Sequence, residues 1–146
     1  MEKLPPIQKI YEAYSAIAAG RCDVRGDGMV VTSSDGTKIY NVEWGSGVYR
    51  STDKATYWQG YPGYPVLAAL MLQGRIPYDR RVADWFAGTP WKQLNDAHKR
   101  DYDAALQEAF VLAGLTDAQI AEARACAEAD MEALKGLDIE VGRLRM

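Results

Sequence analysis

The sequence predicts an α+β fold: an N-terminal helix, an antiparallel β-meander of three to four strands, and a mostly helical C-terminal half with a possible terminal strand. Three observations predict it. An amphipathic helical pattern opens the chain, short β-rich runs punctuated by glycine follow, and capped helical patterns fill most of the rest. Because strands and helices are segregated along the chain, we expect helices to pack on one face of the sheet, with residues 1–146 forming a single α+β domain.

The first helix follows Pro5-Pro6 and ends at Gly20. Its apolar residues recur with the three- and four-residue spacing of one helical stripe, at Ile7, Ile10, Tyr11, Tyr14, Ile17 and Ala18. Gln8, Lys9, Glu12 and Ser15 fall off that stripe and mark a polar face.

The region that follows is predicted to be the meander, with strands near residues 21–24, 29–33, 38–44 and 48–51. The connections are too short for parallel crossovers, so the strands must be antiparallel. Ser34-Asp35-Gly36-Thr37 predicts a two-residue hairpin turn with positive φ at both central positions. Tyr40, Val42 and Trp44 share the strand face that we expect to cover the next helix.

That next helix is the element around which the chain is expected to fold. Residues 66–72 are all apolar, Pro65 suits a first helical turn, and Gly74 suits the position after the last turn. The run is too short to span a bilayer. A helix that is apolar on every side must be covered on every side, so the remaining elements should wrap it.

Three further helices are predicted. Asp79 caps a short one that carries Val82, Trp85 and Phe86, and Thr89-Pro90 starts a long one whose apolar stripe runs from Trp91 to Leu112. Thr116 and Gln119 form a capping box at the start of a helix that ends near Gly136. Alternation at Leu137, Ile139 and Val141 then indicates a strand, which we expect to add to the sheet edge or to a second subunit.

Composition limits the classes of function. The net charge is −3, with a sequence pI near 5.2, which gives no bulk attraction to nucleic acid or to anionic membranes. Arg80-Arg81 and Lys99-Arg100 have acidic neighbours, and this favours solvated helix faces over a basic patch. No secretory signal is visible, and the two isolated cysteines, Cys22 and Cys126, fit a reducing cytosol. We therefore expect a cytoplasmic protein without nucleic-acid or membrane partners.

No metal or cofactor is expected, and no catalytic residue is assigned. His98 is the only histidine, so two-histidine metal motifs are excluded, and no phosphate-binding glycine loop is present. His98 lies on the same apolar stripe as Leu94 and Tyr102, where a histidine more often has a structural than a catalytic role. An enzyme using His98 as a base would need a nucleophile, for which Cys22 and Ser51 are the candidates.

An aromatic cluster is the strongest candidate for a binding site. It comprises six residues before and at the start of the central helix: Trp44, Tyr49, Tyr57, Trp58, Tyr61 and Tyr64. Glycine and proline interrupt this segment at Gly60, Pro62, Gly63 and Pro65, so the rings either fill the core or line a surface. Of the six, Trp58 is the residue most expected to anchor a ligand or partner.

Two hypotheses of function follow. The first is a small non-catalytic protein that uses the aromatic surface beside the central helix to bind a protein partner, a second copy of itself as a homodimer, or a small molecule. The alternative is a small-substrate enzyme with a cleft between the meander and the helices, in which His98 acts as acid or base.

Overall fold

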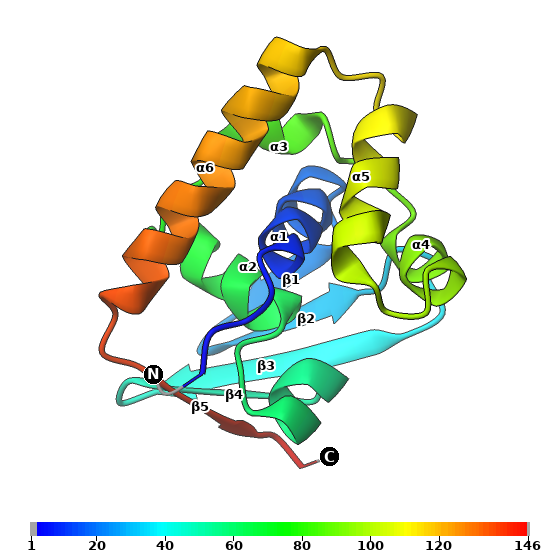
Figure 1. Ribbon diagram of the computed structural model, residues 1–146. Coiled ribbons are helices and arrows are strands. Elements are labelled where there is room, and N and C mark those ends of the chain that lie inside the picture. The colour runs from blue at the N-terminus through cyan, green and yellow to red at the C-terminus, as the bar shows by residue number, and fades with distance from the viewer. Residues whose placement is uncertain (1–2, 146) are drawn as a thin grey trace.

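The computed structural model describes residues 3–145 and has the predicted α+β architecture (Figure 1). Its elements, in chain order, are α1 (Gln8–Ala18), β1 (Cys22–Arg25), β2 (Gly28–Thr32), β3 (Ile39–Gly45), β4 (Val48–Ser51), the π-helical turn η1 (Ala55–Gln59), α2 (Tyr64–Leu72), α3 (Arg80–Asp84), α4 (Trp91–Ala97), α5 (Tyr102–Leu112), α6 (Asp117–Lys135) and β5 (Glu140–Arg143). The six α-helices gather on one side of the sheet (Figure 1). The predicted fold class is therefore confirmed.

The sheet contains five strands in the order β1-β2-β3-β4-β5. The first four form the predicted antiparallel meander. β5 confirms the predicted terminal strand and runs parallel to β4, with Val48 opposite Glu140 and Ser51 opposite Arg143. The C-terminal segment thus completes the sheet of its own chain, after the helical half has crossed over the sheet.

A hairpin loop joins β2 and β3 at the predicted place, but the predicted two-residue turn with two positive φ values is wrong. Thr32 and Ile39 end the paired strands, and of the loop residues between them only Gly36 has positive φ. Asp35 takes a different role, because its carboxylate accepts hydrogen bonds from Ser33 Oγ and from the backbone N and Oγ1 of Thr37. Positive φ at both central positions occurs instead at Ser46 and Gly47, between β3 and β4.

α2 is the buried centre of the molecule, as predicted. Every residue from Pro65 to Met71 is buried, and the helix packs against α1, β3 and β4. Gly74 has φ 72° and ends the helix with the left-handed residue that its position predicted. On β3, Val42 faces this core and Ile39 is exposed, in agreement with the predicted strand faces.

α1 is confirmed as a helix, but its polar face is not solvated. Gln8, Lys9, Glu12 and Ser15 are all buried, although a polar helix face is typically exposed. Ser15 donates a hydrogen bond to the Tyr11 carbonyl and accepts one from Trp91 Nε1 at 2.7 Å. α1 is therefore covered on both faces, and its polar side chains are available for contacts inside the protein.

The predicted long helix of residues 90–113 is two helices, α4 and α5. Lys99 and Arg100 interrupt it, with φ values of 52° and 67°, and Asp101 caps α5 by accepting from Ala104 N. The apolar period continues across the break, which is why the sequence pattern did not reveal it.

The start of α4 also differs from the prediction. Thr89 does not cap it; Ser34 of the β2–β3 loop accepts a hydrogen bond from Lys92 N at 3.0 Å. The Asp79 cap of α3 and the Thr116–Gln119 capping box of α6 are both confirmed.

Within residues 3–145, the helices are all too short or too polar to cross a membrane.

Candidate functional site

A pocket of about 700 Å³ opens between α1, the β2–β3 hairpin, the segment from Asp53 to Tyr64, and the α4–α5 region. Twenty residues line it: Lys9, Glu12, Arg21, Ser33, Ser34, Lys38, Tyr40, Asp53, Lys54, Ala55, Trp58, Gln59, Tyr61, Tyr64, Trp91, Lys92, Asn95, Asp96, Arg100 and Tyr102. The pocket therefore joins parts of the chain that are as many as 93 residues apart, between Lys9 and Tyr102.

A buried ion pair contributes to the lining. Lys9 Nζ lies 2.8 Å from Glu12 Oε2, and the two side chains are only 10% and 7% exposed. The same ammonium sits 4.3 Å from the centroid of the Tyr102 ring, within the range of a cation–π interaction. Burial is the largest single effect and lowers the pKa of Lys9, but the charge and hydrogen bond of Glu12, together with the nearby Tyr102 and Tyr61, outweigh it. The pKa is therefore raised, and the ammonium stays charged.

An amide network holds this pair in place. Gln8 Nε2 donates to Asn95 Oδ1 at 3.0 Å, and Asn95 Nδ2 donates to Glu12 Oε1 at 3.3 Å. The network ties α1 to α4 across the pocket. Glu12 Oε2 lies 2.8 Å from the Lys9 ammonium and has no other partner among residues 3–145, so it retains acceptor capacity.

Asp53 stabilises the part of the pocket wall that η1 and the start of α2 form. Its buried carboxylate accepts hydrogen bonds from Ser51 Oγ and, at 3.0 Å, from Thr56 N. Thr56 Oγ1 in turn accepts from Gly63 N at 2.9 Å. These bonds fix the start of η1 against the start of α2, and thereby place Trp58, Tyr61 and Tyr64 on the pocket wall.

Three tyrosines of the pocket present protonated hydroxyls. Burial raises the pKa of Tyr40, Tyr61 and Tyr64, and the negative charge of Asp53 adds to the effect at Tyr40. The Tyr40 and Tyr64 rings meet edge to face with centroids 6.1 Å apart. The wall therefore combines aromatic surface with hydroxyl donors.

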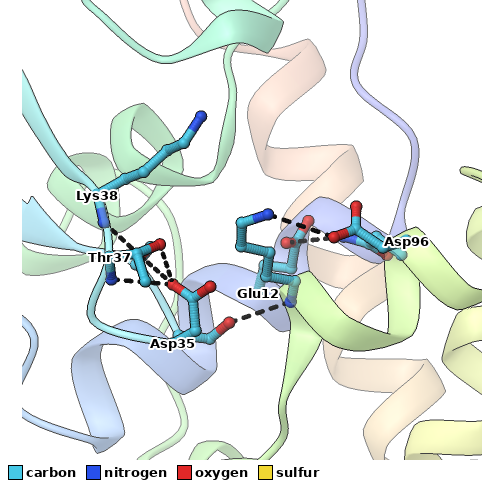
Figure 2. Close-up of polar contacts among 9 residues, drawn as sticks. Glu12, Asp35, Thr37, Lys38 and Asp96 are labelled. Atoms are coloured by element: carbon cyan, nitrogen blue, oxygen red, sulfur yellow. Dashed lines mark hydrogen bonds and ion pairs between the residues drawn. The ribbon is translucent and has the colours of Figure 1, made fainter.

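The β2–β3 loop presents Lys38 to the pocket. The hydrogen bonds from Ser33 and Thr37 to Asp35 lower the pKa of that carboxyl to about 2. Ser33 Oγ also accepts from Lys38 N at 3.0 Å. Figure 2 shows the Lys38 side chain extending away from this loop, with no dashed line reaching its ammonium group.

The six predicted aromatic residues divide into two groups. Trp58, Tyr61 and Tyr64 line the pocket, whereas Trp44, Tyr49 and Tyr57 do not. Tyr49 is 3% exposed, and its hydroxyl donates to Gln73 Oε1 and accepts from Arg75 Nη1 at 3.1 Å. Its ring lies 6.3 Å from that of Trp44, its partner across β3 and β4.

Tyr57 and Trp58 are linked to the C-terminal strand. Their ring centroids are 4.8 Å apart, and the Arg143 guanidinium lies 5.1 Å from the first and 5.3 Å from the second. Arg143 Nε also donates to the Tyr57 carbonyl at 2.9 Å. Trp58 remains 66% exposed, so it combines a fixed backbone with an accessible ring at the rim.

The predicted histidine lies apart from this site. His98 follows α4, and its Nε2 is 2.9 Å from Glu108 Oε1 on α5; it does not line the pocket, and neither does Cys22 or Ser51. The sequence reasoning missed Lys9, Glu12, Tyr40 and Asp53. Lys9 and Glu12 belong to a polar face of α1 and Asp53 to a polar break after β4, and both patterns resemble those of a solvated surface. Tyr40 lies on the strand face that the sequence pattern assigns to the core.

One family model, described as "Uncharacterised conserved protein UCP014422", matches residues 2–140. No curated protein and no solved structure matches the chain.

Proposed function

The chain belongs to this family of uncharacterised conserved proteins, and we propose that it is a non-catalytic protein that binds a small molecule in the pocket between the hairpin and the helices. One observation carries the proposal: the buried Lys9–Glu12 pair and the buried Asp53 carboxylate lie in the lining of the same pocket. Burying charged groups costs folding free energy. Such groups are typical of a binding site, where the fold holds polar side chains in the geometry that a ligand needs.

The size and lining of the pocket support this proposal. A volume of about 700 Å³ falls in the range of roughly 300–1,000 Å³ that is usual for small-molecule sites. The lining is richer in charged and hydroxyl groups than most such sites, which favours a polar ligand over an apolar one. Trp58 supplies a ring at the rim that can stack on a planar part of the ligand.

The contacts of His98 give no support to the enzyme alternative. A general base must come within hydrogen-bond reach of a substrate proton, and the ring nitrogen Nε2 of His98 is instead paired with Glu108 outside the pocket lining. Cys22 is half-buried, and burial raises the pKa of its thiol to about 11, which makes it a poor nucleophile at neutral pH.

The test is a fragment screen on the ¹⁵N-labelled full chain, with amide and indole chemical shifts as the readout. We expect hits that move the resonances of Tyr40, Trp58 and Asn95 together. The variant Trp58→Ala should weaken these hits, whereas Val111→Ala should leave them unchanged, because Val111 is also exposed, at 77%, but lies outside the pocket.

Two results would count against small-molecule binding. One is a library without any pocket hit. The other is a Trp58→Ala variant that loses self-association or a protein partner while the pocket shifts remain those of the wild type. The second result would indicate that the protein functions through the exposed surface around Trp58 and not through the pocket.

A further inference from the structure

Positive charge is concentrated at the pocket. Six cationic side chains and three acidic ones line it, an excess of three positive charges. The whole chain has a net charge of −3, so the residues outside the pocket carry an excess of six negative charges. A pocket whose sign is opposite to that of the protein attracts anions and repels cations at close range.

The six cations differ in whether their side chains have a partner. Lys9 pairs with Glu12, Lys92 Nζ lies 3.2 Å from Asp96 Oδ2, and Arg21 Nη1 donates to the Thr32 carbonyl at 2.8 Å. The other three are Lys38, Lys54 and Arg100, and their side chains form no ion pair or hydrogen bond with the residues from 3 to 145. They come from the β2–β3 loop, the β4–η1 connection and the α4–α5 connection, and all three line one pocket.

The acidic groups of the pocket leave this excess uncompensated. The Asp53 carboxylate is buried and accepts its bonds from Ser51 and Thr56, and that of Glu12 lies against Lys9. An unpaired surface lysine is ordinarily solvated, and by itself it does not indicate a binding site. The convergence of three unpaired cations on one pocket is what distinguishes this arrangement.

The backbone conformation at Arg100 also supports a binding role for this residue. Arg100 follows Lys99, and both adopt left-handed φ values that normally favour glycine or asparagine. Arg100 N is held by the Asn95 carbonyl at 2.9 Å, so the strained turn is fixed to the helix that carries the Asn95 side chain of the pocket. A long cationic side chain at a strained position beside a pocket is more readily explained by binding than by folding.

From this arrangement we infer that the ligand is a small organic anion, a carboxylate or a phosphate, whose charged group is held by Lys38, Lys54 and Arg100. The inference rests on the proposed function and names the ligand class for the same pocket. The Trp58 ring and the tyrosine hydroxyls suit a planar part of the ligand that carries acceptors, and Glu12 Oε2 suits a hydroxyl or N–H donor.

The test uses matched pairs of probes in the same NMR titration. One pair is adenosine 5′-monophosphate and adenosine, the second is 3-hydroxybenzoate and 3-hydroxybenzamide, and inorganic phosphate is titrated alone. We expect the anion of at least one pair to bind at the pocket about tenfold more tightly than its neutral partner. The pair that shows the preference distinguishes phosphate from carboxylate.

Variants tie the preference to the named residues. The double variant Lys38→Gln/Arg100→Gln should weaken anion binding about tenfold and leave the neutral partner unchanged. The matched control is Lys135→Gln, which removes an exposed charge that pairs with Glu132, and neither residue lines the pocket. Both substituted side chains of the double variant lack partners within residues 3–145, so the fold should persist, and thermal unfolding checks this.

The outcomes separate the two proposals. Pocket binding without preference for the anion in either pair, or a preference that survives the double variant, overturns the anion inference and leaves small-molecule binding intact. If these probes and the fragment library all fail to move pocket resonances, the proposed function fails as well.

Discussion

Gly63 lies directly against the Asp53 carboxylate: a Cβ placed on Gly63 would stand 1.9 Å from Asp53 Oδ2 and 2.8 Å from its Cγ. The backbone of Gly63, with φ −72° and ψ 174°, suits any residue. Glycine is therefore needed at this position for space and not for conformation. The close approach lets the start of α2 pack against η1, because Thr56 N donates to the Asp53 carboxylate and Thr56 Oγ1 accepts from Gly63 N. This contact shapes a wall of the pocket.

Gly63→Ala should destabilise the protein by about 1–3 kcal/mol, because the added methyl group overpacks a buried site and displaces a hydrogen-bonded carboxylate. Urea unfolding gives the free energy of unfolding. Gly88→Ala is the control, since a Cβ there meets no atom within 4 Å. A second check is Asp53→Ala/Gly63→Ala, in which the cost of the two changes should be less than additive. Additive costs would show that the Gly63–Asp53 contact is not the cause.

Leu70→Ala tests the central position of α2. Leu70 is fully buried, so its truncation should cost about 2–5 kcal/mol of unfolding free energy. Leu72→Ala in the same helix is the matched control, because Leu72 is 45% exposed and should cost well under half as much. Equal losses in the two variants would contradict the placement of α2.

The sequence patterns predicted the elements that depend on local rules. The alternation of Tyr40, Val42 and Trp44 marked β3, and the Thr116–Gln119 capping box marked the start of α6. The break between α4 and α5 obeys no such rule, because Lys99 and Arg100 are not residues that favour positive φ. Backbone hydrogen bonds from Lys99 N to the Asp96 carbonyl and from Arg100 N to the Asn95 carbonyl hold the break, together with the Asp101 cap.

The site was predictable only in part, for a related reason. Trp58, Tyr61 and Tyr64 share one segment and could be identified as a group. Lys9, Asp53 and Arg100 lie far apart in the sequence, and each has the local surroundings of an ordinary surface charge. Only the packing of α1 beneath α4 and the hairpin brings them to one pocket.

Trp58→Ala should lose less than about 1 kcal/mol of unfolding free energy, because a ring that is 66% exposed gives up little buried surface. A fully buried tryptophan would lose about 3–5 kcal/mol. Denaturant unfolding measures the difference, and Trp91→Ala is the buried comparison, since Trp91 is 2% exposed and donates to Ser15. Similar losses in both variants would mean that Trp58 is a packing residue.

Arg100→Gly separates stability from binding. Glycine adopts φ 67° without the steric cost that arginine pays, so the variant should be as stable as the wild type or up to about 1 kcal/mol more stable. Anion binding should nevertheless weaken, because the guanidinium is lost. Thermal unfolding and the probe titration measure the two effects. A variant that is clearly less stable would show that the Arg100 side chain serves the fold.

Asp130→Asn tests a buried carboxyl outside the pocket. Asp130 on α6 accepts a hydrogen bond from the Tyr14 hydroxyl of α1, and its Oδ1 meets no donor within residues 3–145. Burial raises the pKa of this carboxyl to about 7, against the opposing effect of the Tyr14 hydrogen bond. In the unfolded chain the same group titrates near its ordinary pKa of about 3.9.

The sign of the pH dependence follows from these two values. Between about pH 4 and pH 7 the folded protein holds a proton that the unfolded chain has lost, so Asp130 makes stability fall as pH rises through this window. Asparagine does not ionise, and it can still accept from Tyr14. Asp130→Asn should therefore match the wild type near pH 4 and exceed it by about 1–3 kcal/mol near pH 8, as measured by urea unfolding at both pH values. A variant that is equally destabilised at both would show that Asp130 contributes through its hydrogen bond alone.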